Sequence, residues 1–201
     1  MPEDTFKSYL GIVMQMMDGD LLRFEAQDAD SGARILDAVH RMKIFSEKYI
    51  MLSDEKSMTS ITTQSVCWIR FDTRQPMEWD YHPQIKKVEL ISAAQFKEGL
   101  RKEVPEARND LESNIPGIPI HVYAEFHFNH GDPLYFKIYT QTHVRLDNVR
   151  VANLLREMTT FPAVSSEGGG ILVNMANALH WTTHPAPPDL PNTTWKVTSE
   201  M

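Results

Sequence analysis

The sequence predicts an α+β fold in which a few amphipathic helices lie on one face of antiparallel sheets. Apolar and polar residues alternate over Leu21–Gln27, which is the period of a half-buried strand. The period then changes to that of an amphipathic helix over Ser31–Ile44, with Ser31 as the expected N-cap. Short polar breaks typical of hairpins separate three extended runs that follow: Lys48–Ser53, Ser57–Thr63 and Ser65–Phe71.

A strand followed by a helix recurs further along the chain. Lys87–Ile91 predicts a short strand, and Ser92–Glu103 predicts a helix with Ser92 as N-cap that Pro105 brings to an end. Clean alternation over Ile120–Phe128 and Leu134–Thr140 predicts the strongest hairpin in the sequence. The meander, the two helices and this hairpin together indicate one main domain.

The remaining segments have weaker patterns. Residues 1–20 indicate a loose extension or one helix face, residues 106–119 a loop, residues 148–158 a third helix and residues 171–183 an extended run. We expect four parts: an N-terminal extension (1–20), a clamp-like α+β domain (21–140), a partial second strand–helix–strand unit (141–184) and a Pro-rich tail (185–201).

Composition limits the class of protein. The lone Cys67 excludes a disulfide framework within the chain, and we expect it to be a small buried hydrophobe. No apolar run approaches the roughly 18–20 residues of a membrane span. The start of the chain, Pro2-Glu3-Asp4, is acidic where a signal peptide is basic, so we expect a nuclear or cytoplasmic protein that is not secreted.

The charges are distributed unevenly. The formal net charge is −7, which argues against a nucleic-acid partner. The three predicted helices nevertheless carry about +4 between them, so the rest of the chain is strongly acidic. Lys and Arg are common on solvated helix faces, which explains the bias without any ligand. The alternative is that the helices turn basic side chains toward DNA phosphates: Arg34, Arg41, Lys43, Lys97, Arg101, Lys102, Arg150 and Arg156.

The order of elements resembles a sliding DNA clamp domain of the proliferating-cell-nuclear-antigen class. The stretches "LLRFEAQDADSGARILDAVHRM", "KYIMLSDEKSMTSI", "SVCWIRF" and "KVELISAAQFKEGLRKEV" are most similar to subunits of the heterotrimeric DNA-damage checkpoint clamp. The stretch "VRVANLLREM…GGGILVNMANALHW" resembles the second strand–helix of such a subunit. The chain departs from the pattern because it has three predicted helices where a two-domain subunit has four.

The resemblance implies a function without catalysis. Subunits of that family assemble into a ring around duplex DNA, contact phosphates through basic helix faces and recruit other proteins on the outside. It implies like subunits and duplex DNA as partners, a role in replication or DNA-damage signalling, no cofactor and no catalytic residue.

Two other functions stay open. His121, Glu125 and His127 share one face of the predicted hairpin, with His130 in its turn, and imidazoles with a carboxylate can bind a metal ion. A small metal-dependent enzyme or a ligand-binding domain is therefore one alternative, although a solvent-facing polar strand has the same pattern. The other alternative is a protein-interaction domain with no role on DNA.

Overall fold

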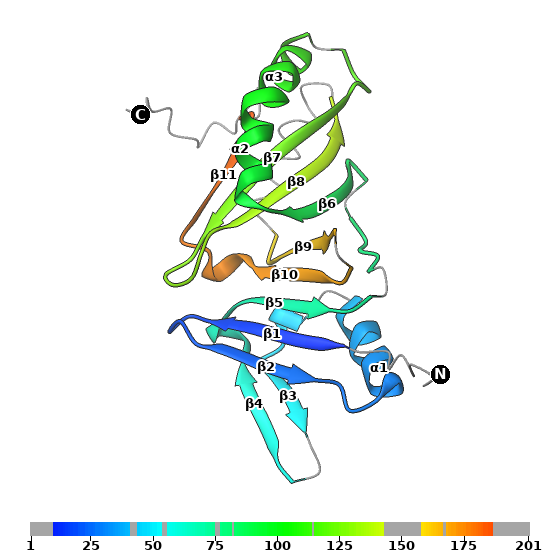
Figure 1. Cartoon of the computed structure of the whole chain (residues 1–201), viewed down its shortest axis with the longest axis vertical. Coiled ribbons are helices and arrows are strands. Elements are labelled where there is room, and N and C mark those ends of the chain that lie inside the picture. Colours follow the sequence, from blue (N-terminus) through cyan, green and yellow to red (C-terminus); the bar gives the residue numbers. More distant parts are fainter. Residues whose placement is uncertain are drawn as a thin grey trace, which may run out of the picture.

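The computed structural model is an α+β fold, as the sequence predicts (Figure 1). It describes residues 10–40, 44–53, 56–74, 77–81, 83–113, 115–142, 158–166 and 168–186. The helices in this part of the chain are α1 (Ala29–His40), α2 (Ala93–Lys102) and α3 (Val104–Glu112). The strands are β1 (Gly11–Met16), β2 (Leu21–Glu25), β3 (Tyr49–Ser53), β4 (Met58–Thr62), β5 (Val66–Asp72), β6 (Ile85–Ile91), β7 (Pro119–His127), β8 (Leu134–Gln141), β9 (Thr160–Ser165), β10 (Gly170–Asn174) and β11 (His180–His184).

Most of these strands join one large sheet. Its nine strands have the order β11-β7-β8-β6-β9-β10-β5-β1-β2, while β3 and β4 form a separate two-stranded sheet. Neighbours in the large sheet are antiparallel except β6 and β9, which are parallel and share only the pairs Glu89–Val164 and Leu90–Ser165. Directly paired residues point to the same face of a sheet. The two pairs between β6 and β9 therefore show which residues on either side of this short parallel pairing lie on the same face of the large sheet.

Each face of the large sheet has its own hydrophobic core. On one face, the rings of Phe126, Phe136 and Phe161 lie with their centroids 4.9–5.2 Å apart. Two other strands separate β7 from β9 in the sheet, so the sheet must curl strongly to bring Phe126 against Phe161. The opposite face carries a second core, which contains the buried Ile12 and Phe71 together with Val39 of α1.

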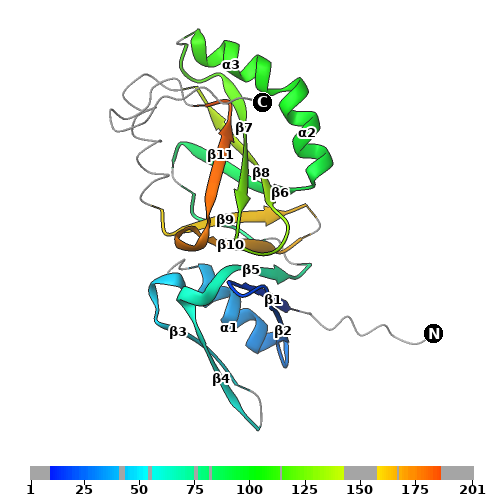
Figure 2. The same cartoon turned by 90° about the vertical axis from the view of Figure 1, so that its left-hand side faces the viewer.

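The helices cover the face of the second core, but at the two ends of the molecule. In Figure 2, α2 lies to the right of β7 and β8 and α3 lies above β7, whereas α1 lies to the left of β1 and β2, beside the β3–β4 hairpin. A sheet twists by about 20–25° per strand, so one continuous face turns through a large angle between β8 and β1. The predicted common face is therefore present for α1 and α2, but these helices do not form one wall.

The helix boundaries differ from the prediction at two places. Asp28 caps α1 instead of Ser31, because its Oδ1 accepts a 2.7 Å hydrogen bond from the Ser31 N–H and its pKa is lowered by that bond. At α2 the predicted cap is confirmed: Ser92 and Gln95 form a reciprocal capping box. Pro105 does not end the helical region, since it lies in the first turn of α3, where a missing N–H costs nothing.

Several strand predictions were wrong. Gly11–Met16, expected in an extension, is the buried strand β1 between β5 and β2. The expected three-strand meander is divided, because β3 pairs with β4 and with no other described strand, while β5 joins the large sheet. The expected extended run 171–183 is broken by a 3₁₀ turn at Met175–Asn177. The large sheet thus takes strands from three of the four expected parts, and boundaries at residues 20 and 140 do not divide it.

The remaining predictions concern Cys67, the third helix and membrane-spanning segments. Cys67 is buried, as expected, and is a free thiol. Residues 148–157 of the third predicted helix lie outside the described residues. None of the helices in the described part of the chain has the length and apolar content needed to cross a bilayer.

Candidate functional site

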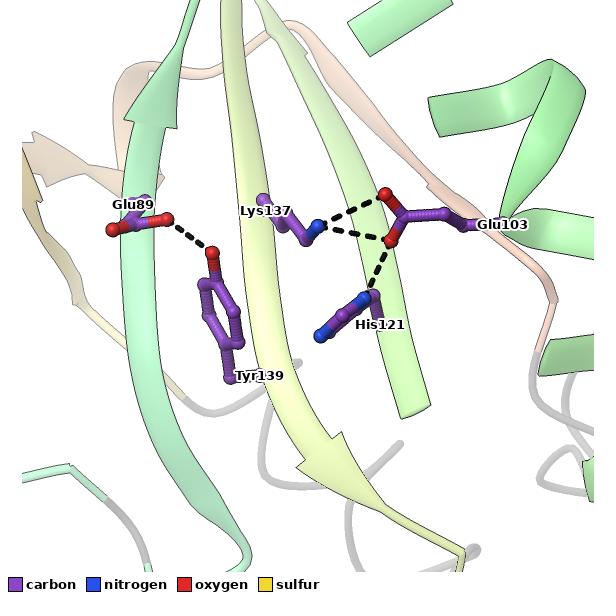
Figure 3. Close-up of polar contacts among 5 residues, drawn as sticks. All are labelled: Glu89, Glu103, His121, Lys137 and Tyr139. Atoms are coloured by element: carbon purple, nitrogen blue, oxygen red, sulfur yellow. Dashed lines mark hydrogen bonds and ion pairs between the residues drawn. The ribbon is translucent and has the colours of Figure 1, made fainter. Parts of the chain in front are cut away.

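A group of ionisable side chains lies where α2 and α3 pack on β7 and β8 (Figure 3). Glu103 stands between the two helices and is both the C-cap of α2 and the N-cap of α3. The alternation of β7 and β8 turns His121 and Lys137 toward this helix junction, while their neighbours enter the core on the other face. The packing of a helix junction on a strand pair thus brings three ionisable side chains from three segments together.

Glu103 is the centre of these contacts. Lys137 Nζ lies 3.1 Å and 2.9 Å from its two carboxylate oxygens, and His121 Nδ1 lies 2.5 Å from Oε2. Tyr123, which is almost fully buried, also hydrogen-bonds to the carboxylate. The Glu103 side chain is 38% exposed and that of Lys137 is 17% exposed, so the ion pair is partly shielded from water.

A second carboxylate continues this group along the sheet. Glu89 on β6 accepts a hydrogen bond from the Tyr139 hydroxyl and pairs with Lys87. The Tyr139 ring also lies beneath Lys137, whose Nζ is 5.4 Å from the ring centroid. The ring of His121 meets it edge-on at 4.9 Å. We call Glu89, Glu103, His121, Tyr123, Lys137 and Tyr139 the helix-junction cluster.

The contacts in the cluster shift the pKa values of Glu103, Tyr123 and Tyr139. Burial alone would raise the pKa of the Glu103 carboxyl, but hydrogen bonds from Lys137, Tyr123 and His121 outweigh it and lower the pKa to about 2. Burial and the nearby carboxylates raise the pKa of the Tyr123 and Tyr139 hydroxyls. At neutral pH, Glu103 is thus a stable carboxylate and a weak base, and both tyrosines keep their protons. These protonation states favour a structural role, in which Glu103 links the α2–α3 junction to β7 and β8, over general acid–base catalysis.

The four residues considered for a metal site are spread over the hairpin. His121 contacts Glu103, whereas Glu125 Oε2 lies 3.4 Å from Nε2 of His127. His130 is exposed at the turn, beside Gly19 of the β1–β2 turn. Among the described His, Cys, Asp and Glu side chains, no three converge as a group that could hold a metal ion. Six residues of extended strand separate His121 from His127 by about 20 Å, which explains why they do not meet.

The basic side chains predicted to face DNA phosphates lie on two separate helices, as far as the described residues include them. Arg34 is on α1, where its guanidinium donates a 3.3 Å hydrogen bond to Ser31 Oγ. Lys97, Arg101 and Lys102 are exposed on α2, and Lys102 pairs with Glu98 at 2.6 Å. Four residues of the predicted set lie outside the described residues: Arg41, Lys43, Arg150 and Arg156. The unexpected helix α3 adds one arginine and three acidic residues, so α2 and α3 together carry no net positive charge.

The β3–β4 hairpin has an apolar outer face that the sequence analysis did not single out. Tyr49, Met51 and Met58 are 46%, 61% and 65% exposed. The register places all three on one face of the hairpin, because Met51 is paired with Ser60 and Met58 with Ser53. Ile50 and Leu52 point to the other face and pack on the second core. The signal was present in the sequence, since Tyr49–Leu52 is apolar at every position, unlike a strand with one solvated face.

Comparisons with protein-family models, curated proteins and solved structures found no match to this chain.

Proposed function

We propose that this chain acts by assembly with other protein subunits, and that the outer face of the β3–β4 hairpin is its contact surface for a second copy of the chain. The observation that carries the proposal is the exposure of Tyr49, Met51 and Met58 on one face of this hairpin. The hairpin extends from the body of the molecule, so that face is accessible to a partner (Figures 1 and 2). Exposed apolar groups gathered on one face are typical of interaction sites.

The geometry of the hairpin supports a symmetric contact. The edges of β3 and β4 that face away from each other pair with no other described strand. The pair Met51–Ser60 is the middle one of five, so a twofold axis near it would place each Met51 against the partner's apolar face. Methionine side chains adapt to such a surface because they are flexible and polarisable. The patch is small, so we expect a weak, concentration-dependent dimer.

This proposal predicts the result of placing a charge on the hairpin. Met51→Lys combined with Met58→Lys should abolish concentration-dependent association in sedimentation velocity, because each lysine would have to be desolvated at the contact. The matched control is Leu179→Lys, since Leu179 is 61% exposed but lies away from the hairpin, just before β11. Association lost equally in the control, or unchanged in the double variant, would contradict the proposal.

A clamp-like ring around duplex DNA is the more specific form of this proposal, for replication or DNA-damage signalling. The observation in its favour is that Lys97 and Arg101, one helical turn apart, are exposed on α2 and form no ion pair with any described residue. Phosphate contacts of this kind need no base-specific residue. The position of α1 on the other side of the molecule is less favourable, because a ring lining needs both helices on one wall.

The DNA form predicts a salt effect. If Lys97 and Arg101 contact phosphates, Lys97→Glu combined with Arg101→Glu should weaken the salt dependence of binding to duplex DNA. The magnitude of the slope of the log binding constant against log salt concentration should fall by about 2. Arg34→Glu on α1 is the comparison, and it should also lower the slope if both helices line one channel. An unchanged slope in the α2 variant would leave assembly without a role on DNA.

A further inference from the structure

Two histidines form a directly registered pair at the edge of the large sheet. His127 ends β7 and His180 begins β11, and the two residues are opposite each other in the antiparallel ladder. Their imidazole rings are nearly parallel, with an interplanar angle of 13° and centroids 4.3 Å apart. Opposed residues in such a ladder have Cβ atoms about 5 Å apart and side chains on the same face. The backbone therefore holds the two imidazoles together.

The surroundings of the pair leave it open to a small ligand. His180 is exposed and the His127 side chain is 32% exposed. The backbone at this point is fixed, because the Leu179 N–H donates a 2.8 Å hydrogen bond to the His127 carbonyl. Glu125 is the nearest described carboxylate, with Oε2 3.4 Å from His127 Nε2. The pair thus stands on a fixed backbone, is accessible to solvent and has a carboxylate beside it.

We propose that His127 and His180 form a two-imidazole binding site for a borderline transition-metal ion such as Zn²⁺. Imidazole nitrogens bind Zn²⁺ at about 2.0–2.1 Å, so two of them in a tetrahedral site lie about 3.3 Å apart. Two nearly parallel rings 4.3 Å apart cannot both aim a nitrogen at one ion, so each imidazole must turn out of the stack about its side-chain torsions until both ring planes contain the ion. The ladder itself does not change. Water fills the other positions, because no third described His, Cys, Asp or Glu side chain joins the two imidazoles in a group that could hold the ion.

This site differs from the set that the sequence suggested. It keeps His127, with Glu125 as its neighbour, but it replaces His121 and His130 with His180, which is more than fifty positions from His127 along the chain. His121 hydrogen-bonds to Glu103, and His130 lies in the β7–β8 turn, beside Gly19 of the β1–β2 turn. Only the pairing of β11 with β7 brings the two imidazoles together. The inference is independent of the proposed assembly and of the β3–β4 hairpin.

Calorimetric titration of the full chain with Zn²⁺ tests the site. We expect saturable binding of one ion with a Kd below about 1 mM, weakened at least about tenfold by either His127→Ala or His180→Ala. His130→Ala is the matched control, since it removes an imidazole from the same β7–β8 hairpin and should leave the Kd unchanged. Mg²⁺, which prefers oxygen ligands, should not bind there.

A second measurement needs no variant. In the unaltered chain, Zn²⁺ should shift the imidazole resonances of His127 and His180 in NMR spectra and leave those of His130 in place. Because β11 pairs with β7 and with no other described strand, bound Zn²⁺ should also raise the Tm. Absence of binding at millimolar Zn²⁺, or equal weakening by the His130 variant, would overturn the proposal.

Discussion

Gly99→Ala is expected to destabilise the protein, although alanine is normally the better helix residue. A Cβ built on Gly99 would lie 2.2 Å from Cε1 and Cζ of Tyr123, whose side chain is almost fully buried under α2. The helix or the tyrosine must move, and overpacking of this kind costs about 1–3 kcal/mol. Movement of Tyr123 would also weaken its hydrogen bond to Glu103. The free energy of unfolding in urea measures the effect.

The chain offers a matched control for this substitution in α1. Gly32 is also buried within a helix, but the nearest atom to its built Cβ is Leu10 Cβ at 3.5 Å, an ordinary contact. Gly32→Ala should therefore be neutral or stabilise the protein by up to about 1 kcal/mol. In a Tyr123→Ala background, Gly99→Ala should lose most of its cost. Equal effects at the two glycines would contradict the close packing of α2 on β7.

Glu103→Gln is expected to lower the free energy of unfolding at pH 7 by about 1–2 kcal/mol. The substitution removes the carboxylate that pairs with Lys137, which is only 17% exposed. The figure is well below the full equivalent of the pKa shift, because Glu103 is 38% exposed and water screens the pair. Urea unfolding of the variant and the unaltered chain at several pH values measures the difference.

The pH dependence of this difference has a definite sign. The pKa of Glu103 is about 2 in the folded protein against an ordinary value of 4.5, so the native state binds fewer protons than the unfolded chain between these values. The stabilising effect of Glu103 is complete above pH 4.5 and is lost as the pH falls toward 2. Glu98→Gln is the control, since the Glu98–Lys102 pair is exposed on α2 and should contribute little. A difference that persists at pH 2 would show that charge is not its cause.

The elements predicted with most certainty are those whose sequence pattern is local. The hairpin of β7 and β8 and the N-cap at Ser92 were predicted closely, because alternation and a cap lie within a few residues. Gly11–Met16 was missed because β1 lies between two strands, β2 and β5, and its residues are buried on both faces, so no alternation marks it. Pro105 was misjudged because proline is tolerated in the first turn of a helix, and only packing on β7 shows that α3 forms.

The candidate sites were harder to predict because they depend on distant pairings. Glu103, Lys137 and His121 meet through the packing of a helix junction on two strands, which no spacing in the sequence encodes. His180 meets His127 only because β11 pairs with β7. The histidines that the sequence placed together are far apart for the opposite reason, since six residues of strand extend over about 20 Å. Local patterns thus predicted the elements, and tertiary pairing decided the sites.

The most direct test of assembly through the hairpin is a disulfide between two copies. Ser60 lies on the outer face, opposite Met51, near the expected twofold axis, and the only natural cysteine, Cys67, is buried. Under mild oxidation, Ser60→Cys should give covalent dimers whose yield falls when Met51→Lys and Met58→Lys are added. Ser92→Cys, exposed at the α2 cap, is the control and should stay largely monomeric. Dimer yields from Ser60→Cys no higher than from Ser92→Cys would contradict the proposed contact.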